Sequence, residues 1–166
     1  QAVEGTGVKV LDTRKTTPGQ RYLEKYAVRM GGGHNHRTNL EEMLMLKDNH
    51  IDQAGSITAA VCALRKAYDI CPPLEVECRT LEHVLEAVSL SPQRIMLDNM
   101  PVQTAAEALR LIPPHIESEI SGNVTLATIR PLAELRPTFI STGAITHSAT
   151  VADFSMRLTQ SPRENA

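Results

Sequence analysis

Residues 74–88 read LEVECRTLEHVLEAV, a short strand pattern followed by an amphipathic helix pattern. Leu81, Val84, Leu85 and Val88 recur at the spacing of one helical face. Thr80 is the expected N-cap, because its hydroxyl can accept a hydrogen bond from a backbone N–H of the first turn. This stretch therefore predicts one strand–helix unit.

Units of the same kind occupy most of the chain. Four predicted strands begin at residues 74, 94, 116 and 138, and this regular spacing leaves room for one strand, one helix and two short loops each time. Such alternation predicts parallel strands covered by helices, wound either around a barrel or into an open doubly wound sheet. The predicted strands are Val8–Leu11, Met43–Leu46, Leu74–Cys78, Arg94–Leu97, Ile116–Ile120 and Thr138–Ser141. The predicted helices are Gly19–Met30, Ile57–Tyr68, Leu81–Val88, Val102–Leu111, Leu126–Leu135 and Ala149–Met156, with Ser56, Thr80 and Thr125 as N-caps.

We favour the barrel. A complete barrel of eight units usually needs about 250 residues, whereas this chain has 166. The expected fold is therefore α/β: an incomplete TIM-like barrel of about six to seven parallel βα units, forming a single domain over residues 1–166.

Composition excludes several classes of protein. The chain is 42% hydrophobic and 22% charged, which is typical of a globular domain and not of a disordered one. No apolar run approaches the ~20 residues of a membrane span, and no signal-peptide pattern is present. Three cysteines without a CxxC pair predict free thiols in a reducing compartment. We therefore expect a cytoplasmic protein that does not contact membranes.

The charge pattern points to a small anionic ligand. The net charge is -2 and the chain has no Trp, which argues against nucleic acid as a partner. Residues 9–37 nevertheless carry seven Lys and Arg against two acidic residues. A local positive field in a slightly acidic protein favours a small anion over a polyanion.

Polar or glycine residues follow the predicted strands at their carboxyl ends. In parallel α/β folds these ends form the ligand-binding face, so six strands that all deliver such residues predict a shared site. The residues expected there are Thr13, Arg14, Lys15, Lys47, Glu77, Asp98, Ser121, Gly122, Asn123, Ser141, Thr142 and Gly143.

The cations of this face are Arg14, Lys15, Arg37 and Lys47. A guanidinium matches a carboxylate or phosphate through two parallel hydrogen bonds, and an ammonium supplies a point charge. Turns with Gly122 and Gly143 expose backbone N–H groups that can hold a phosphate. These residue types predict an anionic, phosphorylated or carboxylated substrate.

Two carboxylates, Glu77 and Asp98, are expected on neighbouring strands. They either form buried ion pairs with the cations, or hold Mg²⁺ with a phosphorylated substrate, or stabilise a developing positive charge. Glu75 lies on the same face of its strand but nearer the start, so we expect it to lie outside the chemistry.

The segment Gly31–Arg37 contains three glycines and a His-x-His pair, His34 and His36. One interpretation is an anion-facing His36 beside Arg37. The other is a metal-dependent hydrolase whose ion is held by His34 and His36, which requires the pair on a strand.

Seven motifs, in this order, resemble the quinolinate phosphoribosyltransferase family (nicotinate-nucleotide pyrophosphorylase, carboxylating) in its C-terminal barrel domain. The resemblance covers about residues 5–158. The motifs are Leu11–Gly19, Gly31–Gly33 with Asn35–Arg37, Leu46–His50, Glu75–Glu77, Leu97–Asn99, Ser121–Asn123 and Ser141–Ala144.

The resemblance implies a reaction of NAD biosynthesis. Quinolinate and phosphoribosyl pyrophosphate would give nicotinate mononucleotide, pyrophosphate and CO₂, with Mg²⁺ as cofactor. The residues implied for quinolinate are Thr13, Arg14, His36, Arg37 and Lys47. Those implied for phosphoribosyl pyrophosphate and its phosphate are Lys15, Ser121, Gly122, Asn123, Ser141, Thr142 and Gly143. The implied catalytic residues are Lys15, Glu77 and Asp98. Of these, Glu77 and Asp98 are also the implied ligands of Mg²⁺.

The family also has an N-terminal α/β domain that is absent from this chain. The resemblance implies a homodimer or larger assembly, in which that domain covers the partner's barrel and adds a substrate-binding Arg. We therefore expect this chain to fold alone but to have at most trace activity. A non-catalytic phosphate- or dicarboxylate-binding barrel fragment is the alternative, besides the hydrolase above.

Overall fold

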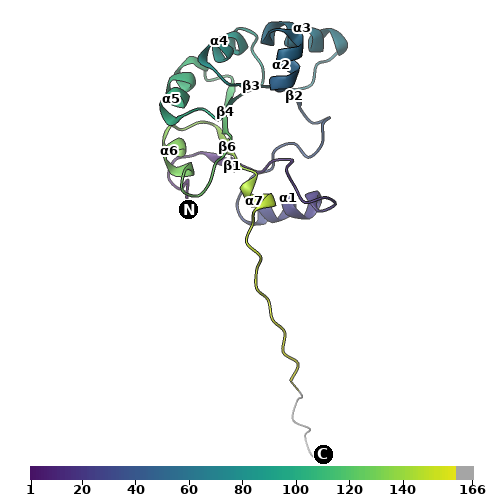
Figure 1. Ribbon diagram of the computed structural model, residues 1–166, viewed down its shortest axis with the longest axis vertical. Helices are drawn as coiled ribbons and strands as arrows, with labels where there is room; N and C mark the ends of the chain where they lie inside the picture. The colour runs from purple at the N-terminus through teal and green to yellow at the C-terminus, as the bar shows by residue number, and fades with distance from the viewer. Residues whose placement is uncertain (160–166) are drawn as a thin grey trace, which may run out of the picture.

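The computed structural model describes residues 1–159, in which six parallel strands alternate with helices (Figure 1). The predicted α/β class is therefore confirmed. The strands are β1 Lys9–Leu11, β2 Leu44–Leu46, β3 Leu74–Cys78, β4 Arg94–Asp98, β5 Glu117–Ser121 and β6 Phe139–Ser141. The helices are α1 Arg21–Met30, α2 Asp48–Ala54, α3 Ile57–Ala67, α4 Leu81–Ser89, α5 Val102–Leu111, α6 Ile129–Glu134 and α7 Ala144–His147.

The strand order is β1-β6-β5-β4-β3-β2. An open doubly wound sheet reverses its order near the first strand, whereas here the order runs without reversal from β2 to β6 and then to β1. Figure 1 shows α3, α4, α5 and α6 following one another around the outside of the strands. Within residues 1–159 β1 and β2 do not pair, and the free edge of β1 carries a single bridge, Leu11 to His34. The described residues thus form one six-stranded parallel sheet that curves but does not close, and the incomplete barrel stays a prediction.

The core lies between the strands and the outer helices. Val76, Ile95, Leu97, Ile120 and Ile140 are almost fully buried and belong to one apolar cluster with residues of α3 to α6. Each such side chain contributes about 1.5–3 kcal/mol when it leaves water. Because side chains alternate along a strand, the intervening residues point to the inside of the arc. Those residues are Glu75, Glu77, Met96, Asp98, Glu119, Ser121 and Ser141.

Two of the three predicted N-caps are confirmed. Ser56 Oγ accepts from Ala59 N–H at 3.0 Å, and Thr80 Oγ1 accepts from His83 N–H at 3.2 Å. Thr125 as a cap is wrong, because α6 begins after Thr128 and is shorter than the predicted helix. Thr125 lies instead in the preceding turn and donates its N–H to Thr128 Oγ1 at 2.9 Å.

The chain end differs most from the expectation. The predicted helix over Ala149–Met156 is wrong, because residues 149–159 have no regular secondary structure and are exposed. Their apolar residues Phe154, Met156 and Leu158 alternate with polar ones, a spacing that gives no apolar helical face. The short helices α2 and α7 were not predicted. No helix among residues 1–159 has both the length and the apolar character needed to cross a membrane.

Candidate active site

A cavity of about 810 Å³ lies where the strands end. Every residue that the sequence predicted for the site lines it. These residues are Thr13, Arg14, Lys15, His36, Arg37, Lys47, Glu77, Asp98, Ser121, Gly122, Asn123, Ser141, Thr142 and Gly143. The fold therefore brings together side chains from all six strand ends and from the 31–43 segment.

The loop after β1 presents Arg14 and Lys15 to the cavity. Arg14 is half-buried, and its Nε is a buried donor without a hydrogen-bond partner among the described residues. The loop is held from below, because Thr146 Oγ1 of α7 donates to the Lys15 carbonyl at 2.8 Å. A buried guanidinium donor that has no protein acceptor is suited to an anionic ligand.

A buried ion pair fixes the segment that carries His36. Asp12 Oδ1 accepts from Lys25 Nζ of α1 at 2.6 Å and from the His36 N–H at 2.8 Å. Asp12 Oδ2 accepts from Asn35 Nδ2 at 2.6 Å, and Lys25 Nζ also donates to the His36 carbonyl at 2.8 Å. Residues 35–36 are thus attached to the end of β1 through a fully buried carboxylate.

Arg37 is the second guanidinium of the site. Its Nη1 donates to the Met43 carbonyl at 2.7 Å, which ties it to the residue before β2. Burial lowers the pKa of Arg37, and repulsion from Arg14 lowers it further. Neither Arg14 nor Arg37 forms a salt bridge within residues 1–159. Two neighbouring like charges without a carboxylate partner favour binding of an anion.

The third side of the cavity pairs Lys47 with Glu77. Lys47 is the residue before α2, and its Nζ lies 3.6 Å from Glu77 Oε2. Burial is the main cause that raises the pKa of Glu77, and the charges of Asp98 and Asp48 raise it further, against the lowering effect of Lys47. Glu77 and Asp98 are thus close enough to repel, and a cation between them would relieve that repulsion.

The loops after β4 and β5 lock together beside Asp98. Asn99 Nδ2 donates to Asp98 Oδ2 at 2.9 Å, and Asn123 Nδ2 donates to Asn99 Oδ1 at 2.9 Å. Gly122 has φ +95°, and a Cβ there would lie 2.4 Å from Asn99 Cγ. Glycine is required at this position because both the backbone conformation and the contact with Asn99 exclude a side chain.

The predicted phosphate turns lie side by side. Ser141 Oγ donates to Ser121 Oγ at 2.9 Å, and Thr142 Oγ1 donates to the Val124 carbonyl at 2.8 Å. Gly143 makes room for His147 of α7, since a Cβ there would lie 2.8 Å from His147 Nε2. His147 lines the same cavity.

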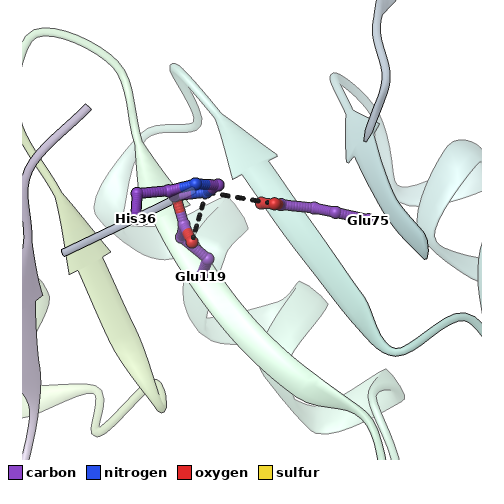
Figure 2. Close-up of side chains that lie close together, drawn as sticks. All are labelled: His36, Glu75 and Glu119. Atoms are coloured by element: carbon purple, nitrogen blue, oxygen red, sulfur yellow. Dashed lines mark ion pairs between the residues drawn. The ribbon is translucent and has the colours of Figure 1, made fainter. Parts of the chain in front are cut away.

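Beneath the cavity the arc is filled by buried charges. Arg94 Nη1 donates to Glu119 Oε2 at 3.0 Å and stacks on Phe139, with its guanidinium carbon 4.1 Å from the ring centre. His36 Nε2 lies 3.1 Å from Glu75 Oε2 and 3.5 Å from Glu119 Oε2 (Figure 2). Glu75 itself does not line the cavity, so its expected place outside the chemistry stays a prediction, but its fully buried carboxylate contacts His36, which does line it.

The two-histidine metal site is also wrong. His34 is exposed, whereas His36 is buried, so the two side chains do not share one face. A regular strand would have put both on the same face, but only His34 forms a bridge to β1 and residues 35–37 have no regular secondary structure. The His34 backbone instead pairs with β1, where its N–H donates to the Val10 carbonyl at 2.8 Å. The two imidazoles therefore cannot share one ion, and the hydrolase alternative loses its ligands.

Sequence reasoning gave no role to Glu119, Arg94, Lys25 or His147. Glu119 and Arg94 did carry a signal, since each is a charged residue inside a strand that is otherwise buried. Lys25 lies on a helix rich in charges and carries no such signal.

The fold and the cavity together define a class of protein: a parallel α/β domain whose strand ends converge on one cavity lined by cations, carboxylates and glycine turns. Comparison with known proteins then gives the family. The family model described as quinolinate phosphoribosyl transferase, C-terminal domain, matches residues 1–157. The chain therefore belongs to the quinolinate phosphoribosyltransferase family.

Relatives agree with this assignment. A probable nicotinate-nucleotide pyrophosphorylase (carboxylating) of Synechocystis is 47% identical over 161 residues, which cover 95% of this chain and 55% of that protein. The Bacillus subtilis protein of the same description is 44% identical, over 93% of this chain and 53% of its own length. The chain thus spans about half the length of these relatives.

Solved structures give the same result. NadC from Streptococcus pyogenes superposes with a TM-score of 0.89 at 44% identity, over 94% of this chain and 55% of that one. Nicotinate-nucleotide pyrophosphorylase from Ehrlichia chaffeensis gives a TM-score of 0.84 at 40% identity, over 89% of this chain and 53% of that one.

Proposed function

We propose that this chain forms the catalytic half of a quinolinate phosphoribosyltransferase. It transfers phosphoribose from phosphoribosyl pyrophosphate to the ring nitrogen of quinolinate, with loss of pyrophosphate and CO₂, and gives nicotinate mononucleotide. The observation that carries the proposal is the cavity itself, which combines unpaired guanidinium groups with two neighbouring carboxylates and two glycine turns.

Quinolinate would bind on the cationic side. Its two adjacent carboxylates can engage more cations than a single acid does, and Arg14, Arg37 and Lys47 supply three positive groups to the cavity wall. The unpartnered Nε of Arg14 supports this placement. Thr13 and His36 line the same wall and complete the proposed quinolinate contacts.

Phosphoribosyl pyrophosphate would bind along the other strand ends. Lys15 would engage the pyrophosphate, and the turns at Ser121–Asn123 and Ser141–Gly143 would hold the phosphate through backbone N–H groups. The like-charge pair Glu77 and Asp98 fits Mg²⁺, whose preferred ligands are carboxylate oxygens. Mg²⁺ held there would neutralise the charge of the leaving pyrophosphate.

The protein's own contribution to the transfer is positional and electrostatic. As pyrophosphate leaves, positive charge develops on the ribose ring, and the carboxylates of Glu77 and Asp98 would stabilise it. The cations that hold quinolinate would keep its ring nitrogen in line with the ribose C1. After the N–C1 bond forms, the positively charged pyridinium nitrogen accepts the electron pair released when CO₂ leaves, and a proton then takes the place of CO₂. No covalent protein nucleophile is needed.

We further propose that the active enzyme is a homodimer in which a second domain covers the cavity. Exposed apolar side chains of α1, Tyr22, Leu23, Tyr26 and Met30, support a protein partner on this side of the barrel. The free cysteines Cys62, Cys71 and Cys78 support a reducing, cytoplasmic location.

The direct test is calorimetric titration of the 166-residue chain with quinolinate, using nicotinate as the matched ligand with one carboxylate fewer. Tighter binding of quinolinate is expected, because its second carboxylate would engage cations of the cavity that nicotinate leaves without an anionic partner. Formation of nicotinate mononucleotide is then measured after the N-terminal part of the Bacillus subtilis relative is added. Equal affinity for the two ligands, together with no product in the reconstituted mixture, would contradict the proposal.

A further inference from the structure

A group of buried side chains reaches the cavity from below, and two of its members, Glu75 and Glu119, have no place in the proposed chemistry. The His36 imidazole lies between the carboxylates of Glu75 and Glu119, both of which are 0% exposed (Figure 2). The three side chains offer ligand atoms within 4.8 Å of one another, a spacing that also suits a metal ion. The question is what occupies the space between them.

The hydrogen bond at the other ring nitrogen, Nδ1, shows which nitrogen of His36 carries the hydrogen. The Arg37 N–H donates to His36 Nδ1 at 2.8 Å. A backbone N–H is always a donor, so Nδ1 carries a lone pair and no hydrogen. In a neutral imidazole the hydrogen is then on Nε2, the atom that faces Glu75 and Glu119.

This tautomer excludes a metal ion at the cluster. Ligation needs a lone pair on Nε2 and therefore a hydrogen on Nδ1, which would collide with the Arg37 N–H. Arg94 adds a second obstacle, because its guanidinium already occupies Glu119 Oε2 at 3.0 Å. The space between the three side chains therefore holds the Nε2 hydrogen.

We propose that Glu119 is a positioning residue of the active site: with Glu75 it receives the Nε2–H of His36, and it thereby fixes the ring so that Nδ1 holds the backbone of Arg37. Arg94 anchors Glu119 from below, with its Nε and Nη2 bound to Glu117 Oε2 at 3.1 and 2.9 Å. The contacts thus run from the floor of the barrel to the cation that faces the ligand.

The protonation of Glu119 supports this arrangement. Burial, and then the charge of Glu75, raise the pKa of Glu119 to about 7. A carboxyl group that is partly neutral at neutral pH lowers the repulsion between the two acids. Two carboxyl groups can then face one imidazole without water or metal.

The ligand part of the inference depends on the proposed function, whereas the tautomer does not. The test therefore measures both the tautomer of His36 and the affinity for quinolinate. Nitrogen-15 NMR of the His36 ring in the 166-residue chain reports which nitrogen carries hydrogen, and calorimetry reports quinolinate affinity. The variants are Glu119→Leu, which removes the acceptor that Arg94 anchors and leaves Glu75 alone at Nε2, and Glu119→Gln, whose amide oxygen can replace the lost carboxylate. Glu134→Leu is the control, because Glu134 lies on the outer helix α6 and pairs with Arg130 on the surface, outside the contacts that lead to His36.

In the unsubstituted chain we expect hydrogen on Nε2 and none on Nδ1. Glu119→Leu should convert the His36 signals to a mixture of tautomers and weaken quinolinate binding at least about tenfold, the cost of losing one hydrogen bond to a charged group. Glu119→Gln and Glu134→Leu should retain both the tautomer and most of the affinity.

Three results would overturn the inference. They are hydrogen on Nδ1 in the unsubstituted chain, zinc titration that shifts Nε2 as a ligand, and a folded Glu119→Leu chain with unchanged His36 signals. If Glu119→Leu does not fold, the first two measurements still decide. If the tautomer is as expected but no chain binds quinolinate, the proposed substrate fails and the positioning of His36 stands.

Discussion

Lys25 Nζ lies 2.6 Å from Asp12 Oδ1, and both side chains are buried. This ion pair connects α1 to the end of β1, and the same carboxylate holds the backbone of residues 35–36. A buried pair of this kind need not add net stability, but removing one partner leaves an uncompensated charge. Substitution of Lys25 therefore tests how strongly the position of residues 35–36 depends on this ion pair.

Lys25→Met should lower the free energy of unfolding of the chain by about 3–5 kcal/mol, because Asp12 would remain buried and unpaired. Chemical denaturation followed by circular dichroism measures the change. Arg79→Met is the matched control, since Arg79 pairs with Asp52 at a similar 2.9 Å but on the surface. Its cost should stay below about 1 kcal/mol. Equal costs for the two variants would mean that burial of the Asp12 pair is unimportant.

Arg37→Ala and Lys47→Ala should each weaken quinolinate binding by about 1.5–3 kcal/mol, the range for a charge-assisted hydrogen bond. Calorimetry of the 166-residue chain measures it. Arg65→Ala serves as control, because Arg65 lies on α3, outside the cavity. Unchanged affinity in both variants would remove these residues from the proposed site.

Glu77→Gln and Asp98→Asn should lower turnover more than they lower quinolinate affinity, because they are proposed to act on the phosphoribosyl group. Turnover is measured with the N-terminal part of a relative supplied. Glu134→Gln on the outer helix α6 is a suitable control, whereas Glu75 is not, because it contacts His36. Full turnover in both variants would refute the assignment.

Gly122→Ala should damage both stability and ligand binding. Its positive φ costs about 1–2 kcal/mol for any other residue, and the added Cβ must also displace Asn99, which orients Asp98. Gly55→Ala isolates the first effect, since Gly55 has φ +85° and no atom within 4 Å of the place that a Cβ would take. Phosphoribosyl pyrophosphate affinity should fall only in Gly122→Ala, and a loss in both variants would contradict the role of Asn99.

The pH dependence of stability should contain a term from Glu119. Its pKa rises from 4.5 to about 7 on folding, mainly through burial. Between these values the folded state holds more protons than the unfolded state, so the contribution of this group to stability is greatest below pH 4.5 and falls as the pH rises to about 7. Glu119→Gln should remove that decline relative to the unsubstituted chain. Parallel stability profiles for the two proteins over this range would show that Glu119 titrates normally.

The sequence alone was sufficient where the signal is local. Each predicted strand contains apolar residues and runs into polar or glycine residues at its carboxyl end, so both the α/β class and the residues of the cavity could be predicted before their positions were known. Helices failed where this signal is weak: α2 and α7 are short, and Leu126 is apolar but exposed, which made α6 appear longer than it is.

Only the tertiary structure decided which charges meet. The inside of the arc joins residues from strands and loops that are far apart in the chain, and no local spacing relates His36 to Glu75 and Glu119, or Asp12 to Lys25. Strand order also came from the structure, because the pairing of β1 with β6 depends on how all the units curve together. The sequence thus determined the elements and the chemical character of their ends, and the curvature of the sheet determined the contacts among its buried charges.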